Sequence, residues 1–155
     1  MFNGRSYPAV TDVIVDADAC PVKEEVAEIA ANFNIPVVYV ASYNHFSINR
    51  SGNWVYVDTM KEAADMKIVN LAKRTTLVIT QDIGLASLLL AKAALVINQY
   101  GVIYDENTID GSLERRYLAA KQRRQGVHSK GPKAFTFENR LDFKKRFVSY
   151  LETME

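Results

Sequence analysis

Val13-Ile-Val-Asp16-Ala-Asp18 and Leu77-Val-Ile-Thr80-Gln-Asp82 are the two stretches that decide the fold of this 155-residue chain. Each begins as a short apolar run, which is typical of a buried strand, and each ends in aspartate directly before a helical pattern. Strands that alternate with helices in this way indicate parallel βαβ units. The chain is therefore predicted to be an α/β protein with a mostly parallel central sheet and flanking helices.

Three more apolar runs complete the pattern, and the expected strands are 13–15, 36–40, 54–57, 77–79 and 95–97. Apolar residues recur at helical spacing between them, and Asp58 or Thr59 is expected to cap the helix after the third strand. A basic helix is predicted from about 109 to 125, and Thr136 can cap a last helix. The apolar stripe of that last helix consists of Phe143, Phe147, Leu151 and Met154.

Length and composition fit one domain, residues 1–155, with a basic C-terminal helical section from about 107 to 155. No apolar run approaches the ~18 residues of a membrane span, and the first residues do not resemble a secretory signal. The single cysteine, Cys20, excludes an internal disulfide and a multi-cysteine zinc site. We expect a cytoplasmic protein that does not associate with membranes, and the oligomeric state stays open.

Aspartates gather where the predicted strands end, which is where open parallel sheets bind ligands. Asp16 and Asp18 follow the first strand, and Asp82 follows the fourth. Any one of them could simply cap a helix. Two strands that end this way, one with a doubled carboxylate, favour a shared site, because clustered like charges usually require a cation.

Asp65 is predicted at the edge of the inward face of its helix, where a carboxylate needs a partner. Either it pairs with Lys61 or a nearby cation, or it completes a metal site. Oxygen ligands without histidine or thiolate favour Mg²⁺ or Mn²⁺. The predicted metal ligands are Asp16, Asp18, Asp65 and Asp82. Thr80 either hydrogen-bonds a carboxylate or metal-bound water, or is an ordinary strand-end hydroxyl.

The charge is distributed unevenly along the chain. Residues 1–113 contain 8 basic and 13 acidic residues, a net charge of -5, whereas residues 114–155 contain 11 and 5, a net charge of +6. A basic segment can bind a polyanion, although it can equally be a solvated helix face. The residues that could follow a nucleic-acid backbone are Arg115, Arg116, Lys121, Arg123, Arg124, Lys130 and Lys133.

Cys20, His45 and His128 give weaker signals. Cys20 precedes Pro21 at a helix start, where the dipole could lower a thiol pKa, but a small packing residue is the simpler interpretation. The two histidines stand in loops without metal-ligand spacing, so a surface position is favoured for both.

Asp16-Ala-Asp-Ala-Cys-Pro-Val-Lys23 resembles the motif of the YaiI/YqxD family of bacterial proteins. The similarity continues through Ala64-Asp65, Val78-Ile-Thr-Gln-Asp82-Ile-Gly-Leu-Ala86, residues 94–98 and the late Lys130-Gly-Pro132 element. It extends from about Val10 to the last helix. The family is in turn similar to PIN-like domains, a class of metal-dependent nucleases.

This resemblance implies a three-layer PIN-like, or Rossmann-like, fold. Asp16, Asp65 and Asp82, with Thr80, match the carboxylates that a PIN domain takes from its first strand, a helix and a Thr-x-Asp motif. Asp18 would be an addition from the family's own motif. Some relatives carry aspartate at the position of Glu62, which leaves a ligand role there open.

Three functional hypotheses follow. The first is a nuclease dependent on Mg²⁺ or Mn²⁺ that cleaves phosphodiester bonds, with RNA as the expected substrate and Asp16, Asp18, Asp65, Asp82 and Thr80 as its catalytic residues. The second is a phosphatase of the haloacid-dehalogenase type, in which Asp16 is the nucleophile and Asp18 the general acid. The third is a non-catalytic RNA-binding protein that retains only the basic segment. The sequence leaves open whether the protein is an enzyme.

Overall fold

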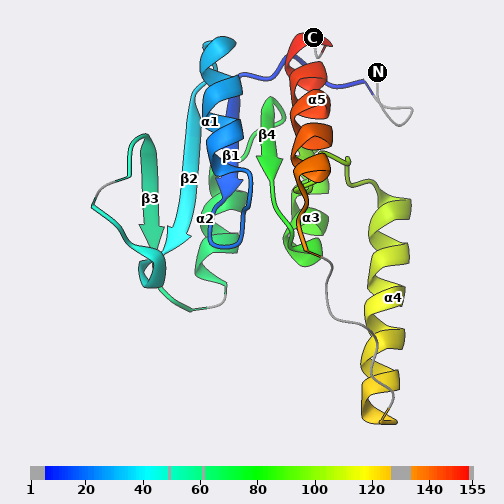
Figure 1. Ribbon diagram of the computed structural model, residues 1–155. Coiled ribbons are helices and arrows are strands. Elements are labelled where there is room, and N and C mark those ends of the chain that lie inside the picture. The colour runs from blue at the N-terminus through cyan, green and yellow to red at the C-terminus, as the bar shows by residue number, and fades with distance from the viewer. Residues whose placement is uncertain (1–5, 49, 61, 127–133, 154–155) are drawn as a thin grey trace.

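A computed structural model describes residues 6–48, 50–60, 62–126 and 134–153. The described residues form one five-stranded sheet in the order β3-β2-β1-β4-β5, and every pair of neighbouring strands is parallel (Figure 1). The strands are β1 (Asp12–Asp16), β2 (Val37–Ser42), β3 (Asn53–Val57), β4 (Thr76–Ile79) and β5 (Leu95–Ile97). The predicted α/β class is confirmed, and this sheet is entirely rather than mostly parallel.

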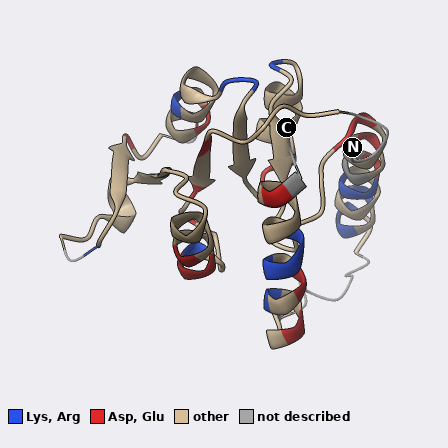
Figure 2. Cartoon of the chain, turned by 90° about the horizontal axis from the view of Figure 1, so that it is seen from above, with Lys and Arg blue, Asp and Glu red and all other residues tan. Residues whose placement is uncertain are grey.

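Helices cover both faces of the sheet. Figure 2 shows α1 and α5 on one face and α2 and α3 on the other, so that the fold has three layers. This arrangement is consistent with the Rossmann-like or PIN-like fold that the resemblance implied. The helices are α1 (Lys23–Asn32), α2 (Ala63–Leu71), α3 (Ile83–Leu90), α4 (Glu106–Arg124) and α5 (Phe137–Thr153), with a short 3₁₀ helix, η1 (Tyr43–His45).

Alternation along the strands divides the core between the two faces of the sheet. Val13 and Val15 of β1 point toward α1 and α5, where Phe143 and Phe147 are fully buried. Ile14, between them, points to the opposite face and joins Ile68 of α2 and the inner residues of α3. Because both faces are covered, the strands are the continuous apolar runs seen in the sequence.

Two helix starts test the predicted caps, and a third tests a predicted boundary. Thr136 caps α5 as predicted, because its hydroxyl accepts a hydrogen bond from the Asn139 N–H at 3.0 Å. The caps predicted for α2 were wrong, since α2 follows Glu62 and has no side-chain cap at that position. Helix α4 begins earlier than predicted, because Asp105 caps it by accepting from the Thr108 N–H at 2.7 Å.

The last helix packs on α1 through its predicted apolar stripe, with one change. Tyr150 is buried beside Phe143 and Phe147, and Leu151 is half-buried. Met154 lies outside the described residues. The stripe therefore continues into Tyr150, whose hydroxyl donates a hydrogen bond to the Gly101 carbonyl at 2.5 Å.

The carboxyl ends of the strands form the lower edge of the sheet in Figure 1, and α4 extends away from the body beside this edge. The start of α4 is anchored by Ile109, which is buried against α3. Most described side chains further along α4 are exposed. None of the helices in the described part of the chain is both long and apolar enough to cross a membrane.

Candidate functional site

Asp16 and Thr80 end two neighbouring strands. Strands β1 and β4 pair in parallel, with Val15 opposite Ile79, so the next residue of each emerges at the same point of the edge. The Thr80 hydroxyl donates a hydrogen bond to Asp16 Oδ2 at 2.8 Å and accepts one from the Asp82 N–H at 3.0 Å. Thr80 is only 1% exposed. One buried hydroxyl therefore fixes the Asp16 carboxylate relative to the turn that carries Asp82.

Asp82 is the N-cap of α3, and its Oδ1 accepts a hydrogen bond from the Leu85 N–H at 3.2 Å. The positive end of the helix dipole stabilises a carboxylate in this position. Gly84 leaves little room beside it, because a Cβ there would lie 3.2 Å from Asp82 Oδ1. The cap engages one carboxylate oxygen, and Asp82 itself is exposed.

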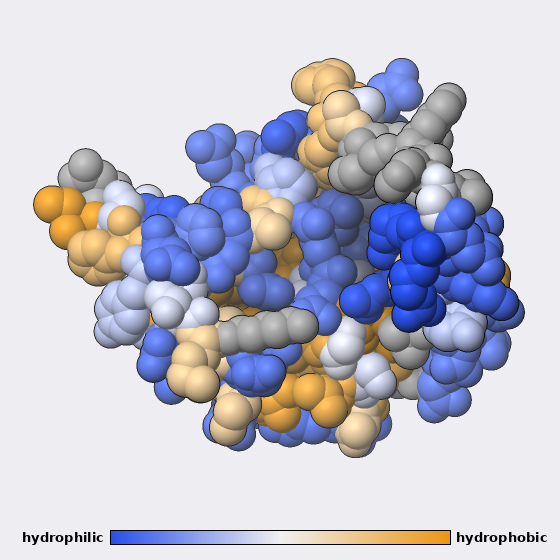
Figure 3. All heavy atoms as spheres, turned by 90° about the horizontal axis from the view of Figure 1, so that it is seen from below, coloured by the Kyte–Doolittle hydropathy of each residue, from blue (hydrophilic) through white to orange (hydrophobic). Residues whose placement is uncertain are grey.

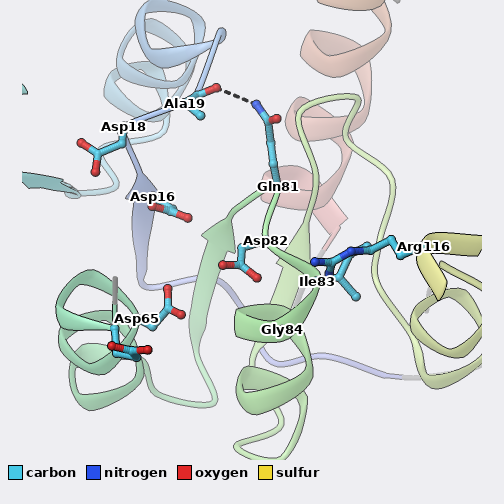
Figure 4. Close-up of a pocket in the computed structure, with 10 residues that line it drawn as sticks. Asp16, Asp18, Ala19, Asp65, Gln81, Asp82, Ile83, Gly84 and Arg116 are labelled. Carbon is cyan, nitrogen blue, oxygen red and sulfur yellow. Dashed lines mark hydrogen bonds between the residues drawn. The ribbon is translucent and has the colours of Figure 1, made fainter. Parts of the chain in front are cut away.

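Asp65 reaches the same place from the first turn of α2. Figure 4 shows Asp16, Asp65 and Asp82 around one hollow, although they come from a strand end, a helix and a helix cap. The predicted convergence of β1, α2 and the turn after β4 is therefore present. Lys61, considered as an alternative partner for Asp65, lies outside the described residues.

The hollow has a volume of about 700 Å³ and opens at the carboxyl edge, where Figure 3 shows it among hydrophilic side chains. Its acidic lining faces one cationic side chain among the described residues, Arg116, which comes from α4. Gln81 joins the two strand-end turns, because its side-chain amide donates to the Ala19 carbonyl at 2.6 Å. The full lining is Asp16, Asp18, Ala19, Glu62, Asp65, Gln81, Asp82, Ile83, Gly84 and Arg116.

Asp18 borders the hollow, but its carboxylate is directed elsewhere. It accepts hydrogen bonds from the Ser42 N–H at 3.0 and 3.2 Å, and Asp18 Oδ1 lies 2.9 Å from His45 Nδ1. In Figure 4 the Asp18 side chain points away from Asp16 and Asp82. Asp18 thus ties the turn after β1 to the turn after β2, and its predicted role as a metal ligand stays a prediction.

His45 is exposed, as its loop position indicated, but sequence reasoning missed its contact with Asp18. The two residues are 27 positions apart, and only the pairing of β1 with β2 brings them together. No spacing in the sequence signals this contact.

The electrostatics of the hollow are clearest at Asp16. Burial raises the pKa of this carboxyl group from 3.8 to about 6, against the opposing effect of the Thr80 hydrogen bond. The nearby charges of Asp65, Asp18 and Asp82 raise the pKa further. A carboxylate held in this way is stabilised by a proton or by another positive charge in the hollow.

The donor chemistry of the hollow fits a hard cation such as Mg²⁺ or Mn²⁺, because its acidic ligands are all oxygen. In the conformation described, no three acidic, histidine or cysteine side chains among the described residues are close enough together to coordinate one ion. Cation binding would therefore draw the carboxylates closer than they are here. A bound cation would offset both the burial of Asp16, which is the main cause of its raised pKa, and the smaller effect of the neighbouring carboxylates.

The predicted basic segment is divided by the structure. Arg115, Arg116, Lys121, Arg123 and Arg124 are exposed on α4, and of these Arg116 lines the acidic hollow. Arg116 and Arg123 also line a smaller depression with Tyr117. Lys130 and Lys133 lie outside the described residues.

Cys20 lies beside the site but is buried in the core, with 6% of its surface exposed. Burial raises the pKa of its thiol to about 11, so the reactive thiolate is disfavoured at neutral pH. This agrees with a packing role.

These features define a three-layer α/β protein with a parallel sheet and an acidic hollow at its carboxyl edge. The chain belongs to the family described as "Uncharacterized BCR, YaiI/YqxD family", whose profile matches residues 14–153. It is similar to the UPF0178 protein Lmo1456 of Listeria monocytogenes, with 49% identity over 92% of this chain and 97% of the relative. It is also similar to a UPF0178 protein of Bacillus pumilus, with 50% identity over 90% of this chain and 83% of the relative. No solved structure matches significantly.

Proposed function

We propose that this protein is a metal-dependent nuclease of the cytoplasm that hydrolyses phosphodiester bonds, with RNA as its substrate. The observation that carries the proposal is the convergence of Asp16, Asp65 and Asp82 on one hollow that also contains Arg116. Carboxylates alone would repel a phosphate, so such a site requires a bound cation to accept one.

In this proposal Asp16, Asp65 and Asp82 hold Mg²⁺ or Mn²⁺. A divalent ion in such a site makes water nucleophilic at neutral pH and neutralises charge that develops on the phosphate. Thr80 keeps the Asp16 carboxylate oriented through its 2.8 Å hydrogen bond. Arg116 supplies positive charge to the substrate phosphate from the opposite wall.

Asp18 has two candidate roles in the proposal: it orients the attacking water or holds a second ion. In the conformation described, the Asp18 carboxylate instead holds the turns after β1 and β2 together, through its bonds to Ser42 and its contact with His45. The arginines of α4, supported by Lys121, would hold the backbone of the nucleic acid beyond the hollow.

The test uses labelled single-stranded and structured RNAs in Mn²⁺, with a generic phosphomonoester assayed in parallel. We expect cleavage of RNA by the wild-type protein and none by Asp82→Asn. Asparagine is also a good N-cap, so this variant should keep α3 intact. Asp142→Asn on the exposed face of α5 is the matched control and should cleave normally.

The other hypotheses give different results. Hydrolysis of the phosphomonoester without cleavage of RNA would support the haloacid-dehalogenase-like phosphatase. Binding of RNA without turnover, with or without Mn²⁺, would support the non-catalytic RNA-binding protein. Cleavage that persists in Asp82→Asn would contradict the assignment of the site.

A further inference from the structure

A row of aromatic rings runs outward along the β2–β3 edge of the sheet. Tyr39 stacks on Trp54 with a centroid distance of 4.7 Å and an angle of 13°. Trp54 is followed by Tyr56 at 6.0 Å and 17°, and Tyr56 by Tyr43 of η1 at 6.1 Å and 26°. These rings come from two strands and the turn after β2, so the fold rather than local sequence assembles the row.

One end of the row is in the core and the other is open. Tyr39 is 4% exposed, whereas Tyr43 is 60% exposed at the outer end. Phe46, which is 55% exposed, stands edge-on to Tyr56 with the ring centroids 4.9 Å apart. The outermost rings therefore present aromatic surface to solvent and rest on the half-buried Tyr56, while the row ends in the core at Tyr39.

Hydrogen bonds hold the inner rings in position. The Tyr39 hydroxyl donates to the Lys23 carbonyl at 3.2 Å, and Trp54 Nε1 donates to the Ser51 carbonyl at 3.0 Å. The Arg50 guanidinium lies 4.1 Å from the centre of the Trp54 ring. Hydrogen bonds thus position the inner rings, and a positive charge lies beside the row, as is common where proteins stack nucleobases.

The open end of the row is joined to the acidic hollow. Asp18, which borders the hollow, accepts from the Ser42 N–H and contacts His45, and these residues flank Tyr43. The register of β1 with β2 places Asp16 opposite Val40, so η1 emerges at the same carboxyl edge as the hollow. Figure 1 shows the turn after β2 and helix α4 on opposite sides of this edge.

We propose that the open end of this row, Tyr43 with Phe46, is a binding site for an unpaired nucleobase of the substrate. The proposal rests on the proposed nuclease function and gives its substrate class as single-stranded RNA. A base in a duplex is already stacked and paired, whereas an unpaired base can extend a row of rings. The positive charge of Arg50 and continuity with the hollow favour a nucleic acid over a protein partner at this surface.

Binding is measured in Mn²⁺ on the Asp82→Asn background, so that cleavage does not interfere, with a fluorescent single-stranded oligoribonucleotide and the same strand in a duplex. We expect the single strand to bind more tightly than the duplex. Tyr43→Ala and Phe46→Ala should each weaken single-strand binding by about tenfold, within the range found for base–aromatic stacking. Duplex binding and the thermal midpoint should change little, because both side chains are largely exposed.

Tyr43→Phe is the matched control, because it keeps the ring and removes only the hydroxyl, and it should bind as the wild type does. Alanine variants that bind single strands normally would overturn the proposal, even if the protein cleaves RNA. Self-association through Tyr43 and Phe46, with equal affinity for both RNAs, would also overturn it. Ring-dependent binding of single strands without cleavage would support the binding site and count against the nuclease.

Discussion

Asp16 is the residue at which burial, hydrogen bonding and charge meet. Its pKa is about 6 in the folded protein, above the ordinary value of 3.8. Between about pH 4 and 6, Asp16 is therefore protonated to a greater extent in the folded state than in the unfolded state. Raising the pH through this window destabilises the protein, and the cost is fully present at pH 7 and absent well below pH 4.

Asp16→Asn should remove this cost while keeping an oxygen that can accept from Thr80. We expect the variant without metal to be more stable at pH 7.5 by on the order of 1–2 kcal/mol, and the gain to disappear below about pH 4. Urea unfolding at both pH values measures the difference. A less stable variant at pH 7.5 would mean that the Asp16 carboxylate is a structural group.

Thr80 is expected to control both the stability and the titration of the site. Thr80→Val keeps the volume but removes the donor to Asp16 and the acceptor for the Asp82 N–H. We expect a loss of about 1–3 kcal/mol in the free energy of unfolding, because polar groups in the turn lose their partners. The pKa of Asp16 should rise further, since the hydrogen bond lowers it.

Thr80→Ser keeps the hydroxyl and serves as the control in both measurements. Unfolding curves report the stability, and carboxyl NMR titration reports the pKa of Asp16. An unchanged pKa in Thr80→Val would show that the hydrogen bond does not lower the pKa of Asp16, which burial and the neighbouring carboxylates would then set.

The site residues that directly follow strands could be predicted from the sequence. The contacts that depend on which strands pair in the sheet could not. Asp16, Thr80 and Asp82 were predictable because apolar strands lead directly into them. The contact of Asp18 with His45 depends on which strands are neighbours, and so does the position of Tyr43. The direction of the Asp18 side chain is set by the Ser42 N–H, which no sequence pattern identifies.

Among the helices, α4 is the one whose two ends differ most in what they contact. Its start is packed on α3, whereas its last turns expose Lys121, Arg123 and Arg124. Few described side chains of α4 beyond Ile109 contribute to the core, so packing does not fix which residues stand there and they can serve binding. The helix therefore offers basic residues whose removal should leave the fold intact.

The double variant Arg123→Ala with Arg124→Ala should weaken RNA binding and leave the thermal midpoint unchanged. If each arginine contacts one phosphate of a single strand, the slope of log K against log salt should fall by about 1.4. Lys144→Ala with Lys145→Ala on α5 removes the same charge elsewhere and is the control. An equal loss of affinity in both double variants would indicate a nonspecific effect of net charge.

Element positions followed from apolar periodicity, whereas their ends depended on local capping. All five strands were expected near where they occur, because each contains an apolar run, although β3 is only half-buried. The start of α4 was placed too late because Asp105 was not recognised as its cap. The start of α2 was placed too early because neither Asp58 nor Thr59 caps it. Caps are single hydrogen bonds, and several nearby polar residues can compete for them.

In the molecule as a whole, the site lies at the point where the strand order of the sheet reverses. From β1 the chain proceeds to β2 and β3 on one side, and then returns to β4 and β5 on the other. Open α/β sheets bind ligands at such a switch point, outside the carboxyl ends of the strands. The strand order could not be predicted from the apolar runs alone, but the acidic ends of β1 and β4 mark the two strands that flank the switch.

We propose above all that Asp16, Asp65 and Asp82 hold one catalytic cation in this hollow. The most direct measurement is anomalous diffraction from a crystal of the wild-type protein soaked in Mn²⁺. We predict an anomalous peak within about 2.0–2.6 Å of carboxylate oxygens from these three residues, with the side chains closer together than they are here. No peak in the hollow at saturating Mn²⁺, or Mn²⁺ bound only at other surface carboxylates, would contradict the claim.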